Sequence, residues 1–167
     1  MSDAAAPGLS VRLADLVGRR IRTERRVEYL DCDGYLHLGA ADFLRFAIDH
    51  RFTATHDALG LNSFERPEET GLAWPIVRSE MDFLAEAKLG DWLVIESWID
   101  ERHNSRAVVR LRISQRDSGR ECCRVALTII ALDVATRRAV PLPDSLPVHR
   151  RVDLDALPWA EGHPSTS

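Results

Sequence analysis

The chain has 167 residues, of which 45% are hydrophobic and 29% are charged, and its formal net charge at pH 7 is -4. This composition is ordinary for one globular domain, and a domain of this size buries about two-thirds of its unfolded surface without a metal or disulfide. The acidic balance argues against a nucleic-acid partner. Apolar runs are only a few residues long, which excludes a membrane-spanning helix of about 20 residues.

The ends of the chain carry few structural signals. The first residues, MSDAAAPGLS, lack the charged and apolar segments of a signal peptide, so we expect a cytoplasmic protein. Three cysteines with an adjacent pair suit a reducing compartment better than a disulfide framework. We expect residues 1–20 to form a flexible or partly helical lead-in, residues 21–157 a single domain, and residues 158–167 a frayed tail.

The first predicted elements are a short strand and a long helix. Polar and apolar residues alternate from residue 26 to residue 29, and an Asp/Gly turn follows at residues 31–34. From residue 40 to residue 59 the apolar period becomes helical, and Gly60 stands where a C-terminal cap is expected. Because this helix is apolar over a broad face, we expect it to be buried.

The rest of the chain predicts a sheet. Strand patterns occupy residues 74–87, 92–99, 107–113 and 122–134. Short turns join consecutive strands, among them DSGR at residues 117–120, which favours an antiparallel meander. A strand, a long helix and a four-stranded meander predict an α+β fold, with a curled antiparallel sheet wrapped around one central helix.

Two segments give the chain a family resemblance. Residues 28–38 read EYLDCDGYLHL directly before the predicted helix, and residues 73–91 read AWPIVRSEMDFLAEAKLGD, with a Pro-Ile-Val entry and a Gly/Asp turn. In their order and spacing, over about residues 22–145, these features resemble the 4-hydroxybenzoyl-CoA thioesterase family of the hot-dog fold. The resemblance implies a hot-dog domain that hydrolyses an acyl-CoA to the free acid and CoA, with no cofactor.

The same resemblance assigns a catalytic site. In that family the second acidic residue of an Asp-x-Asp pair is the catalytic carboxylate, and this residue is Asp33 here. Thioester hydrolysis needs a nucleophile or a general base, and a donor for the oxyanion. The first amides of a helix have no intrahelical partner and lie at the positive end of its dipole. The amide of Gly39 or of Ala40 is therefore a candidate oxyanion donor, and the family pattern implies Ala40, while the small Gly39 lets the substrate come close. We expect Asp31 to be structural.

Two features of this loop leave alternatives open. Many relatives carry Gly-His here, and in this chain Leu36 replaces the Gly. His37 is a candidate to orient Asp33 or to contact the substrate carbonyl, with a surface or packing role as the alternative. An Asp before a helix is also a common cap or turn residue, so a structural role is the alternative for Asp33. The helix entry, Gly39-Ala40-Ala41, departs from the family's Asn-rich or Tyr-containing entry, which leaves the shape of the acyl pocket open.

Four further residues are expected to contact the substrate. Trp74 and Pro75, at the mouth of the second strand, are candidates to line the acyl site, with core packing as the alternative. Ser105 and Arg106 lie between two strands, where relatives place residues near the CoA phosphates. Arginine forks suit phosphates, although an Arg-rich turn is more often simply solvated.

The sequence also bears on oligomeric state, metal binding and alternative functions. The resemblance implies a homodimer or homotetramer whose sheets join edge to edge, with active sites between subunits, which would also cover an open sheet edge. His50 and His56 are six residues apart on the helix and are not aligned for a metal, so no metal is expected. A hydratase or dehydratase using His37 with Asp33, or a non-catalytic acyl-CoA-binding module, remain as alternatives.

Overall fold

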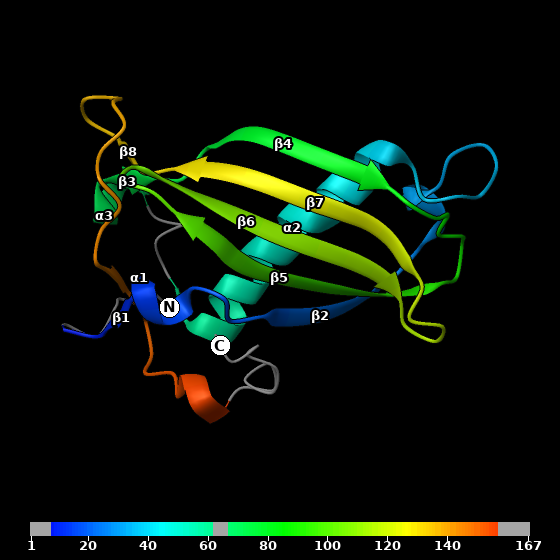
Figure 1. Cartoon of the computed structure of the whole chain (residues 1–167), viewed down its shortest axis with the longest axis horizontal. Coiled ribbons are helices and arrows are strands. Elements are labelled where there is room, and N and C mark those ends of the chain that lie inside the picture. The colour runs from blue at the N-terminus through cyan, green and yellow to red at the C-terminus, as the bar shows by residue number, and fades with distance from the viewer. Residues whose placement is uncertain (1–7, 62–66, 157–167) are drawn as a thin grey trace, which may run out of the picture.

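A long helix lies in the concavity of a curled sheet (Figure 1). The computed structural model of the chain describes residues 8–61 and 67–156, apart from the side chain of Glu69. The elements in chain order are β1 (Ser10–Arg12), α1 (Leu13–Leu16), β2 (Ile21–Arg26), the 3₁₀ turn η1 (Tyr29–Asp31), α2 (Ala40–Leu59), α3 (Pro67–Thr70), β3 (Leu72–Ala73), β4 (Ile76–Phe83), β5 (Trp92–Arg102), β6 (Arg106–Gln115), β7 (Glu121–Ile130), β8 (Leu132–Asp133), β9 (Ser145–Pro147) and η2 (Leu154–Ala156). This arrangement confirms the predicted α+β architecture.

The main sheet has five antiparallel strands in the order β2-β5-β6-β7-β4. Strands β5, β6 and β7 form the predicted meander. The prediction that β4 would form a hairpin with β5 is wrong, because β4 pairs with β7 at the opposite edge of the sheet. The connection from β4 to β5 therefore crosses the end of the sheet.

The path of that connection has a physical cause in its backbone hydrogen bonds. The amide of Leu89 donates to the Leu36 carbonyl at 3.0 Å, and the amide of Gly90 donates to the Val27 carbonyl at 2.9 Å. These acceptors belong to the loop before α2 and to the end of β2, so the crossover is tied to that loop. Both amides thus bond to carbonyls that are distant in sequence, which holds the crossover on this side of the sheet.

The first strand ends earlier than predicted. Strand β2 stops at Arg26, and the alternation expected through Tyr29 instead becomes the turn η1. The cause is a reciprocal cap, in which the Glu28 amide donates to the Asp31 carboxylate at 2.8 Å while the Asp31 amide bonds back to Glu28. This capping box satisfies donors that a continued strand would have presented to a neighbour.

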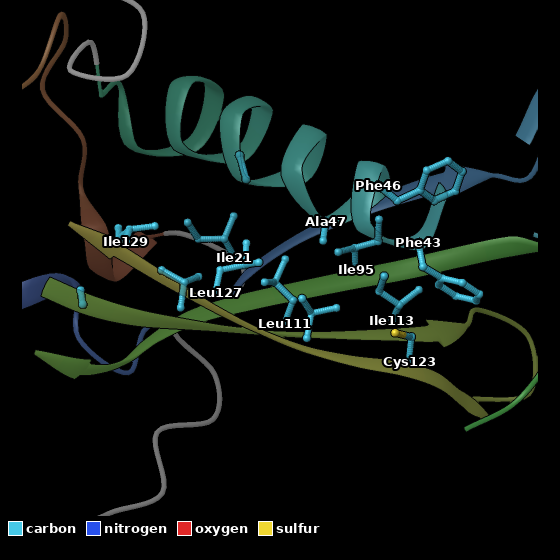
Figure 2. Packing of buried hydrophobic residues seen from close by; sticks show 14 of the residues in the cluster. Ile21, Phe43, Phe46, Ala47, Ile95, Leu111, Ile113, Cys123, Leu127 and Ile129 are labelled. Carbon is cyan, nitrogen blue, oxygen red and sulfur yellow. The ribbon is translucent and has the colours of Figure 1, made fainter. Parts of the chain in front are cut away.

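Helix α2 matches its predicted bounds. Its 20 residues end at Leu59, and the C-cap Gly60 has a φ of 62° and donates its amide to the His56 carbonyl at 3.0 Å. Figure 2 shows Phe43 and Ala47 directed from the helix toward the sheet, and Phe46 is fully buried as well. The buried sheet residues below include Ile95, Leu111, Ile113 and Leu127. The helix is thus held by burial of one apolar face.

Both chain ends contribute to the domain. Strand β1 pairs with β9, and Leu13 and Leu16 of α1 are buried in the core, so residues 10–16 of the expected lead-in pack onto the domain. The tail expected at residues 158–167 lies outside the described residues. Within residues 8–61 and 67–156, no helix combines the length and apolar character needed to cross a membrane.

Three polar side chains form a line between α2 and the sheet. His50 is 3% exposed, and its Nδ1 lies 2.6 Å from Oγ1 of Thr23 while its Nε2 lies 2.8 Å from Oγ of Ser97. Burial lowers the pKa of His50 to about 4, because an imidazolium here would lose its hydration. His50 is therefore neutral at physiological pH.

This burial predicts an acid-sensitive domain. In the unfolded chain His50 gains a proton below pH 6.5, whereas in the folded chain it does so only near pH 4. Over that interval the unfolded state binds more protons, so the free energy of unfolding should fall by about 3 kcal/mol as the pH is lowered. The measurement is urea unfolding across this pH range for wild type and His50→Gln.

His50→Gln should lose the part of the pH dependence of the free energy of unfolding that arises from His50. His103→Gln is the matched control, because His103 is exposed in the β5–β6 turn, and it should keep the wild-type slope. Identical slopes for wild type and His50→Gln would contradict a neutral buried His50.

Candidate active site

Residues 31–39 form a closed loop before α2. Cys32 and Leu38 pair as an isolated antiparallel bridge, and the Asp33 amide donates to the His37 carbonyl at 2.8 Å. At the base of the loop, the Gly39 amide donates to the Asp31 carbonyl at 3.2 Å. These bonds fix the loop against the first turn of α2.

Asp31 anchors this loop, in agreement with the structural role expected for it. Its carboxylate is buried, and Oδ2 accepts a hydrogen bond from the Glu28 amide. Oδ1 accepts a hydrogen bond from the Arg45 guanidinium and lies 3.9 Å from Nη2 of Arg25. Burial alone would raise the pKa of Asp31, but the Glu28 amide, Arg45 and Arg25 outweigh it and lower that pKa. The charged Asp31 thereby links the loop to both α2 and β2.

Asp33 points one carboxylate oxygen into the loop and leaves the other outside it. Its Oδ1 accepts hydrogen bonds from the amides of Tyr35 at 2.8 Å and His37 at 3.1 Å. Within the described part of the chain, no hydrogen bond reaches Oδ2. The side chain is exposed, so Oδ2 is open to a reactant while Oδ1 fixes its orientation.

A hollow of about 380 Å³ lies beside Asp33. It is lined by Asp33, His37, Leu38, Ala40, Phe43, Phe83, Leu84, Ala85 and Glu86. The fold thus brings together Asp33, His37 and Ala40, the three residues that the resemblance places in the catalytic site. The wall is part polar and part apolar, and on its apolar side the rings of Phe43 and Phe83 pack edge to face at 5.8 Å.

Ala40 is the first residue of α2, and Gly39 is its N-cap. Because no residue precedes it in the helix, the Ala40 amide has no intrahelical acceptor. Gly39 has an extended backbone and no capping side chain; a Cβ there would lie 3.0 Å from Oδ2 of Asp42. The small residue at position 39 therefore keeps the helix entry compact, although Gly39 does not itself line the hollow.

His37 contacts Asp33 through its main chain rather than its ring. The imidazole Nδ1 instead lies 3.7 Å from Oε1 of Glu86, across the rim of the hollow. Glu86, Phe83 and Leu84 were not predicted from the sequence. The only signal for them was a pair of large apolar residues, Phe83 and Leu84, at the exposed end of a strand.

The other four predicted substrate residues lie together at the opposite end of the sheet. Pro75 accepts a hydrogen bond from the Ile130 amide at 3.2 Å, Ser105 accepts one from the Ala131 amide at 3.0 Å, and Arg106 pairs with Ile130. The Trp74 carbonyl accepts a bond from Arg51 at 3.2 Å.

These four residues are remote from the hollow within one chain. Phe83 pairs with Cys123, seven residues along β7 from Ile130, which is a separation of about 23 Å. The roles of Trp74, Pro75, Ser105 and Arg106 toward a substrate at Asp33 therefore stay predictions. Among the residues that the structure describes, no group of three or more His, Cys, Asp or Glu side chains is placed to hold a metal.

The sequence profile of the thioesterase-like superfamily matches residues 27–148, which include the loop, α2 and the whole meander. A comparison with curated protein sequences gave no significant match.

Several solved structures have a similar fold. The 1,4-dihydroxy-2-naphthoyl-CoA thioesterase Slr0204 from Synechocystis is 25% identical, with a TM-score of 0.68 over 74% of this chain and 90% of that one. The 4-hydroxybenzoyl-CoA thioesterase from Pseudomonas sp. strain CBS-3 is also 25% identical, with a TM-score of 0.66 over 75% of this chain and 95% of that one. The protein SAV2348 from Staphylococcus aureus, solved in complex with CoA, shares the fold at 19% identity and a TM-score of 0.66, over 76% and 78% of the two chains.

The loop beside Asp33 contains a strained residue that yields a stability prediction. Leu36 has a φ of 60°, a conformation that costs a residue with a side chain about 1–2 kcal/mol and costs glycine little. Its side chain is 45% exposed, so Leu36→Ala removes modest packing and keeps the strain. Leu36→Gly removes the same packing and relieves the strain.

We therefore expect Leu36→Gly to have a free energy of unfolding about 1 kcal/mol above that of Leu36→Ala. Chemical denaturation of the two variants measures this difference directly. Equal stabilities, or a more stable Leu36→Ala, would show that the backbone at position 36 is not left-handed in solution.

Proposed function

Because the chain belongs to the thioesterase-like superfamily, we propose that it hydrolyses an acyl-CoA thioester to the free acid and CoA. The observation that carries this proposal is the composition of the hollow beside α2. The Asp33 carboxylate with its free oxygen, the first amide of a long helix and several large apolar side chains meet there. These are a reactive group, an oxyanion donor and a surface for an acyl group.

Asp33 is the proposed catalytic carboxylate. In one route Oδ2 attacks the thioester carbon, expels the CoA thiolate and forms a mixed anhydride, which water then opens to regenerate Asp33 and release the acid. In the other route Asp33 takes a proton from a water that attacks the same carbon, and this proton then passes to the leaving thiolate. Both routes use the carboxylate oriented by the amides of Tyr35 and His37.

The amide of Ala40 is the proposed oxyanion donor. In either route the carbonyl oxygen gains negative charge as the thioester carbon becomes tetrahedral. A donor without another acceptor, at the positive end of a 20-residue helix, stabilises that charge. The wall formed by Phe43, Phe83 and Leu84 suits an apolar or aromatic acyl group.

Dimerisation through β4 would complete this site. Strand β4 is an edge of the main sheet and exposes Val77 and Phe83. Antiparallel pairing of β4 with the β4 of a second copy would place the start of one strand beside the end of the other. Trp74 and Pro75 of the second copy would then lie near Phe83, which is how they could reach a substrate at Asp33.

Replacement of Asp33 is the direct test of the carboxylate. In Asp33→Asn the amide oxygen can still accept the loop hydrogen bonds, so the fold should persist, whereas a nucleophile or base is lost. We expect kcat to fall by about 10²–10⁴-fold on acyl-CoAs that the wild type hydrolyses, measured by CoA release with a thiol reagent.

Asp133→Asn is the matched control, because Asp133 also accepts a turn amide, from Thr136 at 2.6 Å, but lies far from the hollow. It should retain wild-type turnover. Undiminished turnover in Asp33→Asn would assign the chemistry to another group. An absence of wild-type turnover on a broad panel of aromatic and aliphatic acyl-CoAs would favour a non-catalytic binding module.

The oxyanion donor can be removed without a change of fold. Proline lacks an amide hydrogen but is well tolerated at the first position of a helix, and the extended backbone of Gly39, with a ψ of 153°, accommodates a following proline. We expect Ala40→Pro to lower kcat by about 10²–10³-fold while its helix content is unchanged by circular dichroism. Ala40→Gly, which keeps the amide, should retain most of the activity; equal losses in both variants would exclude the amide as donor.

A further inference from the structure

The hollow beside Asp33 contains two further groups that can accept a proton. Of the described side chains that line it, only Asp33, His37 and Glu86 have a proton-accepting group, and the rest are hydrocarbon. The side chain of His37 is 31% exposed and that of Glu86 is 61% exposed, so water reaches both. When Asp33 itself takes the proton from water, neither His37 nor Glu86 has a task in the chemistry.

Backbone pairing holds His37 beside the segment that carries Glu86. His37 and Lys88 form an isolated antiparallel bridge, and the Leu38 amide donates to the Ala87 carbonyl at 2.8 Å. As a result, Nδ1 of His37 lies 3.7 Å from Oε1 of Glu86, while Oε2 of Glu86 lies 3.9 Å from Nζ of Lys88. Catalytic hydrogen bonds are often long before the substrate binds and tighten in its complex.

The Glu86 carboxylate determines which nitrogen of His37 is basic. A carboxylate accepts hydrogen bonds and does not donate them, so the neighbouring Nδ1 carries the hydrogen of the neutral imidazole. Nε2 is then the nitrogen with the lone pair, and no hydrogen bond or ion pair from residues 8–61 or 67–156 reaches it. A proton taken up at Nε2 produces an imidazolium whose positive charge faces the Glu86 carboxylate.

A second base is required only if Asp33 becomes acylated. In the mixed anhydride, Oδ2 of Asp33 is bonded to the acyl carbon, and Oδ1 is a carbonyl oxygen that accepts the amides of Tyr35 and His37. Asp33 therefore no longer has a basic oxygen. When water attacks the acyl carbon it must lose a proton to another group, whereas Asp33 leaves as a carboxylate and needs none.

We propose that Nε2 of His37 is the base that takes this proton, and that Glu86 is its positioning residue. This proposal rests on thioester hydrolysis at Asp33 and assigns that reaction to the nucleophilic route. Acyl transfer to Oδ2 breaks the carbon–sulfur bond and releases CoA as the thiolate. Hydrolysis then yields the free acid, the Asp33 carboxylate and the imidazolium of His37, which returns its proton to solvent.

Rapid mixing of His37→Gln with an excess of acyl-CoA tests the base. The probe is the compound that the wild type hydrolyses fastest in a panel that includes benzoyl-CoA and hexanoyl-CoA. Acylation should stay fast while opening of the anhydride slows by about 10²-fold or more, so CoA should appear as a burst of about one equivalent per active site, followed by a slow phase. Mass spectrometry of the acid-quenched variant should show one added acyl group on the chain.

Added imidazole supplies a second measurement on the same variant. Because the rim of the hollow is exposed, free imidazole should replace the missing base and speed the slow phase of His37→Gln. Asp33→Asn forms no anhydride and should not respond. Wild-type turnover combined with neither a burst nor an acyl adduct in His37→Gln would overturn the proposal and leave the thioesterase activity standing. A lack of wild-type turnover would contradict the activity itself and the proposal with it.

Glu86→Gln tests the positioning role. Because the pair is exposed, kcat should fall only about three- to fivefold, with KM unchanged. The double variant His37→Gln, Glu86→Gln should be no slower than His37→Gln, because Glu86 acts only through His37. A merely structural role of Glu86 would instead give additive losses. Additive losses, or an unchanged kcat in Glu86→Gln, would overturn the assignment of Glu86.

The pair of His103 and Glu101 is the matched control. Nε2 of His103 lies 3.1 Å from Oε2 of Glu101 in the exposed β5–β6 turn, and neither residue lines the hollow. His103→Gln and Glu101→Gln should keep the wild-type kcat and show no acyl adduct. An adduct in these controls would overturn the assignment of the base to His37.

Discussion

The pairing of the buried Asp31 carboxylate with Arg45 and Arg25 is the interaction on which the candidate active site depends. Asp31 closes the 31–39 loop through its carbonyl, caps η1 through its carboxylate, and binds α2 through Arg45. If this charge were lost, the loop that orients Asp33 would be held to α2 mainly by backbone bonds. A buried, paired carboxylate is costly to break, which makes the position of the loop well defined.

The two arginines are in turn fixed by the hydrophobic core. The Arg25 guanidinium carbon lies 3.9 Å from the centre of the Phe46 ring, and that of Arg45 lies 5.3 Å from it. Both also pair with Asp49, Arg25 at 2.8 Å and Arg45 at 3.7 Å. Cation–π contact on a fully buried ring joins the charged cluster to the packing of α2 against the sheet. The geometry of the site and the stability of the core are therefore coupled.

The parts of the fold and site that could be predicted from sequence are those defined by short-range patterns. The helical period of apolar residues from Ala40 to Leu59 and the Gly60 cap predict the bounds of α2. Asp33, His37 and Ala40 lie together because they belong to one tight loop and to the helix start that follows it. The pairing of β4 with β7 could not be predicted from the sequence. It depends on hydrogen bonds from the amides of Leu89 and Gly90 to the carbonyls of Leu36 and Val27, which are distant in sequence. For the same reason the wall formed by Phe83, Leu84 and Glu86 was not foreseen, since tertiary contacts bring it to the loop. The other predicted substrate residues, Trp74, Pro75, Ser105 and Arg106, lie at the opposite end of the sheet within one chain, and their roles toward a substrate stay predictions.

The central claim, that a thioester is held between Asp33 and the start of α2, is tested most directly by a crystal structure of Asp33→Asn with an intact acyl-CoA. We expect the thioester carbonyl oxygen to lie about 3 Å from the Ala40 amide nitrogen, with the acyl group against Phe43 and Phe83. The carbonyl carbon should lie within van der Waals contact of the substituted side chain at position 33. A thioester bound elsewhere, or with its carbonyl oxygen directed away from the helix N-terminus, would contradict it.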